Sequence, residues 1–226
     1  MRFRQSRGTK GSQKWIQSIV DRNPTLLSDA IRSAFRMPAD WDVQWVSPLV
    51  SDEWAEYRDA DFLAILGVGR LAPSLEAFWP RNGPQWDALG KSSDHGVVLV
   101  EAKSHANELE SSCEASGDSL RRIESSIGEA KSALGVSPSY DWLTQFYQYA
   151  NRLAHLHFFQ KHGVSARLAF VYFTNDPDMQ GPKSASDWRG VLAKTYASLG
   201  FRNGQTIPGV CNVFVDVGVT PPVVTP

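Results

Sequence analysis

Two uninterrupted apolar runs limit the folds that this chain can adopt. They are VVLV at residues 97–100 and the stretch from Leu168 to Thr174. A strand with one face in water alternates apolar and polar side chains, so these runs predict strands that are buried on both faces. Helices must then cover both faces of one sheet. We expect an α/β fold with a central mixed sheet flanked by helices.

The spacing of apolar residues and the positions of turn residues place the other elements around these strands. The expected helices span 12–21, 24–35, 53–66, 119–134, 140–162 and 187–199. The expected strands span 41–50, 86–90, 95–103, 168–174 and 213–217, with 86–90 and 95–103 paired as a hairpin. The chain of 226 residues is predicted to be a single domain, 1–226. We expect a basic, flexible tail at 1–11 and a loose, proline-rich tail at 219–226.

Composition excludes several classes of protein. The formal net charge is −1, so no global basic field draws the chain onto nucleic acid, and a contact of that kind needs a local patch. The basic N-terminal stretch is either a frayed tail, which we favour, or an arm that touches phosphates. No apolar run is long enough to span a membrane, and the two cysteines lack the spacing of a metal site or disulfide framework. We expect a cytoplasmic protein with no membrane partner.

The most informative feature is the end of the first apolar run. VVLV passes directly into Glu101-Ala102-Lys103, where a buried strand would ordinarily end in turn residues. Side chains alternate along a strand, so Glu101 and Lys103 point to the same side. A hairpin brings Asp87 back beside them. Two carboxylates and an ammonium thus gather at the rim of the sheet.

Such a group suits a divalent-metal site that hydrolyses phosphodiester bonds. Mg²⁺ (or Mn²⁺) prefers oxygen ligands and is often held by one or two carboxylates plus water. Asp87 and Glu101 are the predicted metal ligands, together with the backbone carbonyl of Ala102. Lys103 would activate the attacking water or stabilise charge on the phosphate. The alternative is a solvated ion pair between Glu101 and Lys103, which would contribute only about 0–1 kcal/mol to stability.

The pattern Trp86-Asp87, then VVLV-Glu101-Ala102-Lys103, resembles the PD-(D/E)xK nuclease superfamily. The resemblance covers residues 41–174 and implies a restriction-endonuclease-like αβββαβ core with inserted and C-terminal helices. It assigns catalysis to Asp87, Glu101 and Lys103 and implies a Mg- or Mn-dependent nuclease. Its partner would be nucleic acid, DNA in preference to RNA, and pairing into a homodimer is common in the family. Trp86 stands where the family has proline, and the glutamate often found on the first helix is missing between 12 and 35.

Further residues are candidates for lining the site. Gln145 and Tyr149 fit a Q-x-x-x-Y motif of some family members and, four residues apart, would share a helix face; Tyr149 could equally be a packing residue. His105 has the same strand parity as Glu101, but a surface position just past the strand is favoured. Arg152 either contacts phosphate or is solvated, and the second is favoured. His155 is expected to be a packing or surface residue.

A function of another class remains open. The near-neutral charge and the missing first-helix glutamate are also compatible with a catalytically inactive module of the same fold that binds nucleic acid or a protein partner. The two hypotheses differ in geometry. An enzyme requires the side chains of Asp87, Glu101 and Lys103 to converge.

Overall fold

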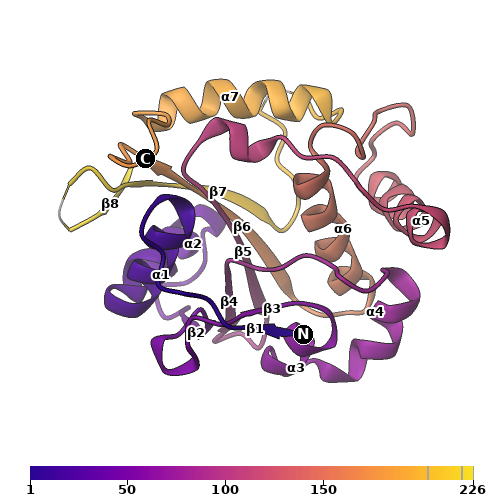
Figure 1. Cartoon of the computed structure of the whole chain (residues 1–226), viewed down its shortest axis with the longest axis horizontal. Helices are drawn as coiled ribbons and strands as arrows, with labels where there is room; N and C mark the ends of the chain where they lie inside the picture. Colours follow the sequence, from indigo (N-terminus) through magenta and orange to yellow (C-terminus); the bar gives the residue numbers. More distant parts are fainter. Residues whose placement is uncertain (203, 220, 226) are drawn as a thin grey trace.

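The structure is a computed structural model that describes residues 1–202, 204–219 and 221–225. Its centre is a mixed six-stranded sheet in the order β2-β4-β5-β6-β7-β8. The strands are β2 (Val43–Ser47), β4 (Ala88–Ser92), β5 (Val97–Lys103), β6 (Ala166–Thr174), β7 (Val210–Asp216) and β8 (Val223–Thr225). The expected α/β class, with a central sheet between helices, is confirmed (Figure 1).

The strands combine antiparallel and parallel pairing. β2, β4 and β5 form an antiparallel meander, in which the β4–β5 hairpin pairs Ala88 with Val100. β6 and β7 then run parallel to β5, with Lys103 beside Tyr172. The two apolar runs seen in the sequence are therefore adjacent central strands, and every residue of β5 is buried. This burial on both faces explains their lack of alternation.

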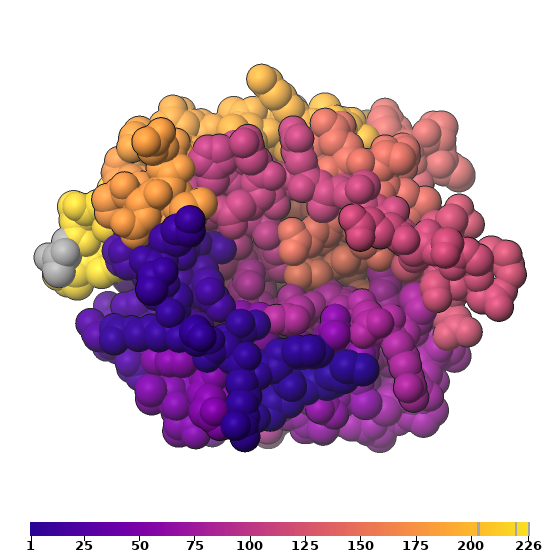
Figure 2. Space-filling model, viewed as in Figure 1, coloured from indigo at the N-terminus to yellow at the C-terminus, as the bar shows by residue number. Residues whose placement is uncertain are grey.

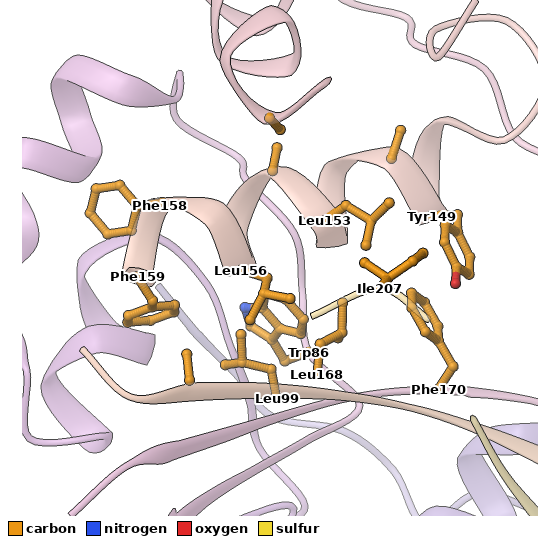
Figure 3. Close-up of a cluster of buried hydrophobic side chains, with 14 of the residues drawn as sticks. Trp86, Leu99, Tyr149, Leu153, Leu156, Phe158, Phe159, Leu168, Phe170 and Ile207 are labelled. Carbon is orange, nitrogen blue, oxygen red and sulfur yellow. The ribbon is translucent and has the colours of Figure 1, made fainter. Parts of the chain in front are cut away.

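Helices cover both faces of the sheet. α1 (Gly11–Arg22) and α2 (Pro24–Phe35) lie against one face. The opposite face is covered by α3 (Asp59–Ile65), α4 (Ala72–Phe78), α5 (Gly117–Ala133), α6 (Tyr147–Lys161) and α7 (Ala185–Ser198). Short 3-10 helices complete the chain at Val50–Asp52, Gly69–Leu71 and Ala106–Leu109. α6 packs its apolar side chains directly onto β5 and β6 (Figure 3).

The strand parity of β5 divides its side chains between two cores. Leu99 packs under α6, in the core that also holds Trp86 and Leu153, as Figure 3 shows. Val98 and Val100 point to the α1–α2 side. Glu101 and Lys103 follow Leu99 in parity, so they lie on the α6 side of the sheet. The fold thus directs both charged side chains toward α6.

Several boundaries differ from those expected. The predicted helix 53–66 begins only at Asp59, because residues 56–57 form β3 (Glu56–Tyr57), which pairs with β1 (Arg2–Phe3). The predicted helix 140–162 begins at Tyr147. Strand 41–50 is shortened to β2, and strand 86–90 is shifted to β4.

Both predicted tails have structure. Residues 1–10, called here the N-terminal arm, pair through β1 with β3, and the arm crosses the front face of the molecule in indigo (Figure 2). Backbone pairing and side-chain hydrogen bonds place the arm against β3 and α1. Within 219–226, Val223–Thr225 forms the edge strand β8 along β7. Thr220 and Pro226 of that predicted tail lie outside the described residues. No described helix has the length and apolar character needed to cross a membrane.

Candidate active site at the end of β5

Asp87 and Glu101 lie side by side on adjacent strands. Asp87 precedes β4 by one residue, and its amide donates a hydrogen bond to the Val100 carbonyl at 3.2 Å, so the ladder extends to it. Its parity is that of Leu89, which packs in the same core as Leu99. The carboxylate of Asp87 therefore projects on the face that carries Glu101. The sequence predicted this meeting of the two acids from the hairpin.

The Asp87 side chain is also fixed by β5. Its Oδ2 accepts a hydrogen bond from the Ala102 amide at 2.7 Å. Ala102 itself faces the α1–α2 core and is fully buried there. It thus contributes an amide that orients a predicted metal ligand, in addition to the carbonyl that the sequence predicted as a ligand.

Glu101 is held by two cations. Lys103 Nζ lies 2.5 Å from Oε1, and the Arg152 guanidinium approaches Oε2 with Nε at 2.7 Å and Nη2 at 2.6 Å. Glu101 is 2% exposed and Arg152 3% exposed, so this is a buried network. The expectation that Arg152 is solvated was wrong. Its side chain lies over the Trp86 ring at 4.9 Å and turns inward because the buried Glu101 carboxylate requires a countercharge.

The α6 residue that meets the Glu-x-Lys strand is Gln148. Its side-chain oxygen accepts a hydrogen bond from Lys103 Nζ at 2.9 Å. The predicted partner Gln145 is exposed and lies before the helix, where its carbonyl accepts a hydrogen bond from the Ser111 amide. Because α6 starts at Tyr147, the helix face toward the site carries Gln148 and Arg152, four residues apart.

Tyr149 and His105 have mainly structural contacts. The Tyr149 ring stacks on Phe170 with centroids 4.0 Å apart, and its hydroxyl donates to Tyr196 at 3.0 Å. The ring borders the small pocket beside Glu101 and Lys103, while its hydroxyl bonds to α7. The His105 side chain accepts a hydrogen bond from the Asn107 amide and caps the 3-10 helix at 106–109. His155 packs within an aromatic cluster.

Glu56 belongs to the site and was missed from the sequence. It sits on β3, 7% exposed, and accepts hydrogen bonds from the side-chain amides of Gln85 and, at 3.2 Å, of Gln5. The Gln85 carbonyl in turn accepts a hydrogen bond from Arg152 at 2.8 Å. The N-terminal arm, β3 and α6 are thereby connected through one polar chain. Only the β1–β3 pairing brings Glu56 here, and no local sequence pattern announces that pairing.

The acids in this cluster differ in how easily they ionise. Burial, then repulsion from Glu101, raises the pKa of Asp87 to about 8. The Asp87 side chain has protein atoms packed around it, but part of its surface still reaches solvent. Burial also raises the pKa of Glu56, and the Glu101 charge adds to that effect. Two carboxyls therefore lie where further negative charge is unfavourable.

Glu101 and Lys103 show the opposite balance. Burial opposes the ionisation of Glu101, but attraction to Arg152 and then Lys103 outweighs it and lowers its pKa. Burial likewise opposes the charge on Lys103, yet Glu101 and Asp87 raise its pKa above the ordinary value. Lys103 is thus a firmly protonated ammonium. It is suited to orienting a water and neutralising phosphate charge, and less suited to removing a proton.

The donor set fits a hard divalent cation held by a few protein oxygens. Asp87 Oδ1 accepts no hydrogen bond within the described residues, and burial followed by repulsion from Glu101 raises the pKa of Asp87. Mg²⁺ commonly binds one or two carboxylates and keeps several waters. No described set of three or more His, Cys, Asp or Glu side chains has the arrangement of a metal cage. Asp87 and Glu101 would hold the ion, with Glu101 exchanging part of its contact with Arg152.

The space beside these side chains is small. The pocket bordered by Glu101, Lys103 and Gln148 has room for about one water molecule or ion. Gln148, which borders the pocket, is half-buried, and so is Asp87, which does not line the pocket. Figure 2 shows the molecule hollowed near the middle of its front face, between the indigo N-terminal segments and the salmon-coloured residues near position 150.

Comparisons with known proteins do not identify a function for this site. No family model, curated protein or solved structure matches the chain. The residues that converge at the end of β5 are therefore the basis for assigning a function.

Proposed function

We propose that this protein is a metal-dependent nuclease that hydrolyses phosphodiester bonds in DNA or RNA, with DNA the favoured substrate. The observation that carries the proposal is the convergence of Asp87, Glu101 and Lys103 on one face at the end of a buried strand pair. This is the arrangement expected from the resemblance to PD-(D/E)xK nucleases. Buried ion networks rarely contribute net stability compared with apolar residues of the same volume, so stability alone gives little reason for this one.

Each residue has a role that follows from its surroundings. A bound Mg²⁺ or Mn²⁺ would lower the pKa of a water and polarise the phosphate. Asp87, oriented by the Ala102 amide, and Glu101 supply the carboxylates for it. Lys103, fixed between Glu101 and Gln148, donates hydrogen bonds toward the reacting oxygens and balances the negative charge that develops on the phosphate. Arg152 positions Glu101.

The test uses purified protein with Mg²⁺ or Mn²⁺ and labelled single- and double-stranded DNA and RNA. We expect cleavage that EDTA abolishes, and binding of Mn²⁺ in calorimetry that Asp87→Ala weakens. Lys103→Ala should abolish cleavage while leaving the circular-dichroism spectrum unchanged. Absence of both cleavage and metal binding would refute the proposal.

A second function is favoured by one observation. Both oxygens of Glu101 are already paired with Lys103 and Arg152, as in a site that needs no metal. In that case the protein is a catalytically inactive module that binds nucleic acid or a protein partner. Stoichiometric binding without turnover, unchanged by Lys103→Ala, would support this function over the enzyme.

A further inference from the structure

A basic groove lies between the N-terminal arm and α1, apart from the candidate active site. Cationic side chains and two tryptophans border it: Arg7, Lys14, Trp15, Arg22 and Trp54. Asp21 is the acidic residue that lines it, so cations outnumber acids three to one. Neither Trp15 nor Trp54 is fully buried in the core.

The arm forms a fixed wall of this groove. Gln17, 1% exposed, uses both ends of its side chain to hold the arm: Oε1 accepts from the Gly8 amide at 2.7 Å, and Nε2 donates to the Ser6 carbonyl at 3.2 Å. The arm runs so close to α1 that a Cβ atom added at Gly8 would lie 2.6 Å from the backbone nitrogen of Lys14. The groove is therefore built into the fold.

Trp54 is held at the groove in a strained conformation. Its φ is 54°, and that of the preceding Glu53 is 55°. A bulky aromatic residue in the left-handed region is uncommon, and such strain persists where the surrounding structure enforces it, often at functional sites. The Trp54 amide is tied to the Leu49 carbonyl at 2.9 Å, and the ring remains half-buried. The strain presents an aromatic surface to the groove.

The charges of the groove are available to a ligand. Arg7 and Arg22 are exposed, and neither forms an ion pair within the part of the chain that the structure describes. Lys14 is partly engaged, with Asp178 at 2.6 Å and the Trp15 ring at 4.4 Å. Because net charge is near zero over the whole chain, unpaired cations concentrated here form a local patch.

The arm that borders the groove also contacts the polar residues of the candidate active site. Gln5, two residues before Arg7, donates a hydrogen bond to Glu56. Two residues of extended chain span about 7 Å. A polymer bound along the arm would thus pass close to Glu56, which hydrogen bonds through Gln85 link to Arg152 and Glu101.

We propose that the basic groove binds a single-stranded segment of nucleic acid, with a base stacked on Trp54 and phosphates beside Arg7 and Arg22. Sites for single strands combine a cationic groove with exposed aromatic rings, whereas bases in a duplex are not free to stack on a protein. The inference rests on the proposed function for its class of ligand, and adds the strandedness of the substrate and the surface that holds it.

The experiment measures binding without cleavage. Fluorescence anisotropy in EDTA would compare the full chain with labelled dT20, rU20 and a 20-base-pair duplex. We expect dT20 or rU20 to bind more tightly than the duplex. Trp54→Ala should weaken single-strand binding by roughly fivefold to a hundredfold, the range for loss of one stacked base. Trp54→Phe, which retains a ring, should keep most of the affinity.

Charge variants test the phosphates separately. Arg7→Ala and Arg22→Ala should each reduce the slope of log affinity against log salt by about 0.7, the value for one phosphate contact to a single strand. Arg121→Ala, an exposed arginine on α5, is the matched control and should not change binding. Melting curves would show that each variant is folded.

The outcomes separate this inference from the proposed function. No binding of dT20 or rU20 by the wild type, equal affinity of Trp54→Ala and wild type, or an equal loss in Arg121→Ala would overturn it. If single-strand binding depends on Trp54 but the protein has no nuclease activity, the inference about the groove stands and the proposed nuclease function is refuted. If the protein cleaves nucleic acid and no groove variant changes cleavage, the nuclease function stands and the inference about the groove is refuted.

Discussion

Two aspartates flank the same strand, β4, and ionise in opposite ways. Asp87 precedes the strand, and its pKa is raised to about 8 by burial and by Glu101. Asp94 follows it in the hairpin turn. Burial opposes ionisation there as well, but hydrogen bonds from Arg167, Ser92 and Trp41 lower the pKa of Asp94 to about 2.

The difference lies in the partners. Asp94 receives a guanidinium at 2.5 Å from Arg167, a hydroxyl at 2.6 Å from Ser92 and an indole N–H from Trp41. Asp87 receives one backbone amide and faces other carboxylates. The protein thus satisfies one aspartate fully and leaves the other short of positive charge. An acid of the second kind is the better candidate for binding a cation.

The largest expected effect separates the two aspartates by activity. Asp87→Asn should reduce metal-dependent cleavage by at least about a hundredfold, because it removes a charged metal ligand. Asp94→Asn should leave the cleavage rate within about twofold of wild type. Initial rates on a labelled DNA substrate at saturating Mg²⁺ measure both. An equal loss of cleavage in the two variants would show that the substitutions act by destabilising the fold and not by changing the chemistry.

Removing the positioning cation should have the next largest effect. Arg152→Ala leaves Glu101 buried with Lys103 as its remaining ionic partner, and we expect the free energy of unfolding to fall by about 3–5 kcal/mol. Urea denaturation followed by circular dichroism measures it. Lys161→Ala, on the exposed side of α6 beside Glu129, is the control and should change stability little. A small effect of Arg152→Ala would mean that Glu101 relaxes toward solvent.

A smaller effect is expected in the pH dependence of stability. An unfolded aspartate has a pKa near 4. Between about pH 4 and pH 8 the folded chain therefore retains a proton on Asp87 that the unfolded chain releases, so stability falls as pH rises through this window. Asp94 acts oppositely: its contribution is present above about pH 4 and is lost as pH falls toward 2.

Urea unfolding at pH 5 and pH 8 measures this effect. Asp87→Asn should reduce the loss of stability between the two pH values by about 1–2 kcal/mol, less than the full shift implies because the side chain keeps some solvent contact. An unchanged loss in the variant would contradict the raised pKa.

The smallest effect concerns the satisfied aspartate. Ser92→Ala removes one of the hydrogen bonds to Asp94, and we expect a loss of about 0.5–1.5 kcal/mol. Thermal unfolding at pH 7 measures it, and the variant should retain cleavage. A much larger loss would indicate that the turn depends on Ser92 more than on Arg167.

The central acids of the site were predictable because they depend on local rules. Strand alternation places Glu101 and Lys103 together, and a hairpin returns Asp87 to them. The rest depends on contacts between distant segments. Glu56 reaches the site through β1–β3 pairing. The register of α6 depends on where the helix starts, which turns Gln148 instead of Gln145 toward Lys103.

The burial of Arg152 was also beyond the sequence. A charged residue on a helix is most often solvated, and the prediction followed that tendency. In the structure Arg152 is buried instead, because it pairs with the buried carboxylate of Glu101. The countercharge can be predicted only once the partner strand and helix are placed together.

The polar chain from Gln5 through Glu56, Gln85 and Arg152 to Glu101 has a consequence for folding. Its links join residues 51, 29, 67 and 51 positions apart in sequence. Contacts of such long range form late, after loop closure has been completed. A fragment or partly folded chain would lack this constellation even with most helices in place. Catalytic activity would thus report that the chain has folded from its first residues to α6.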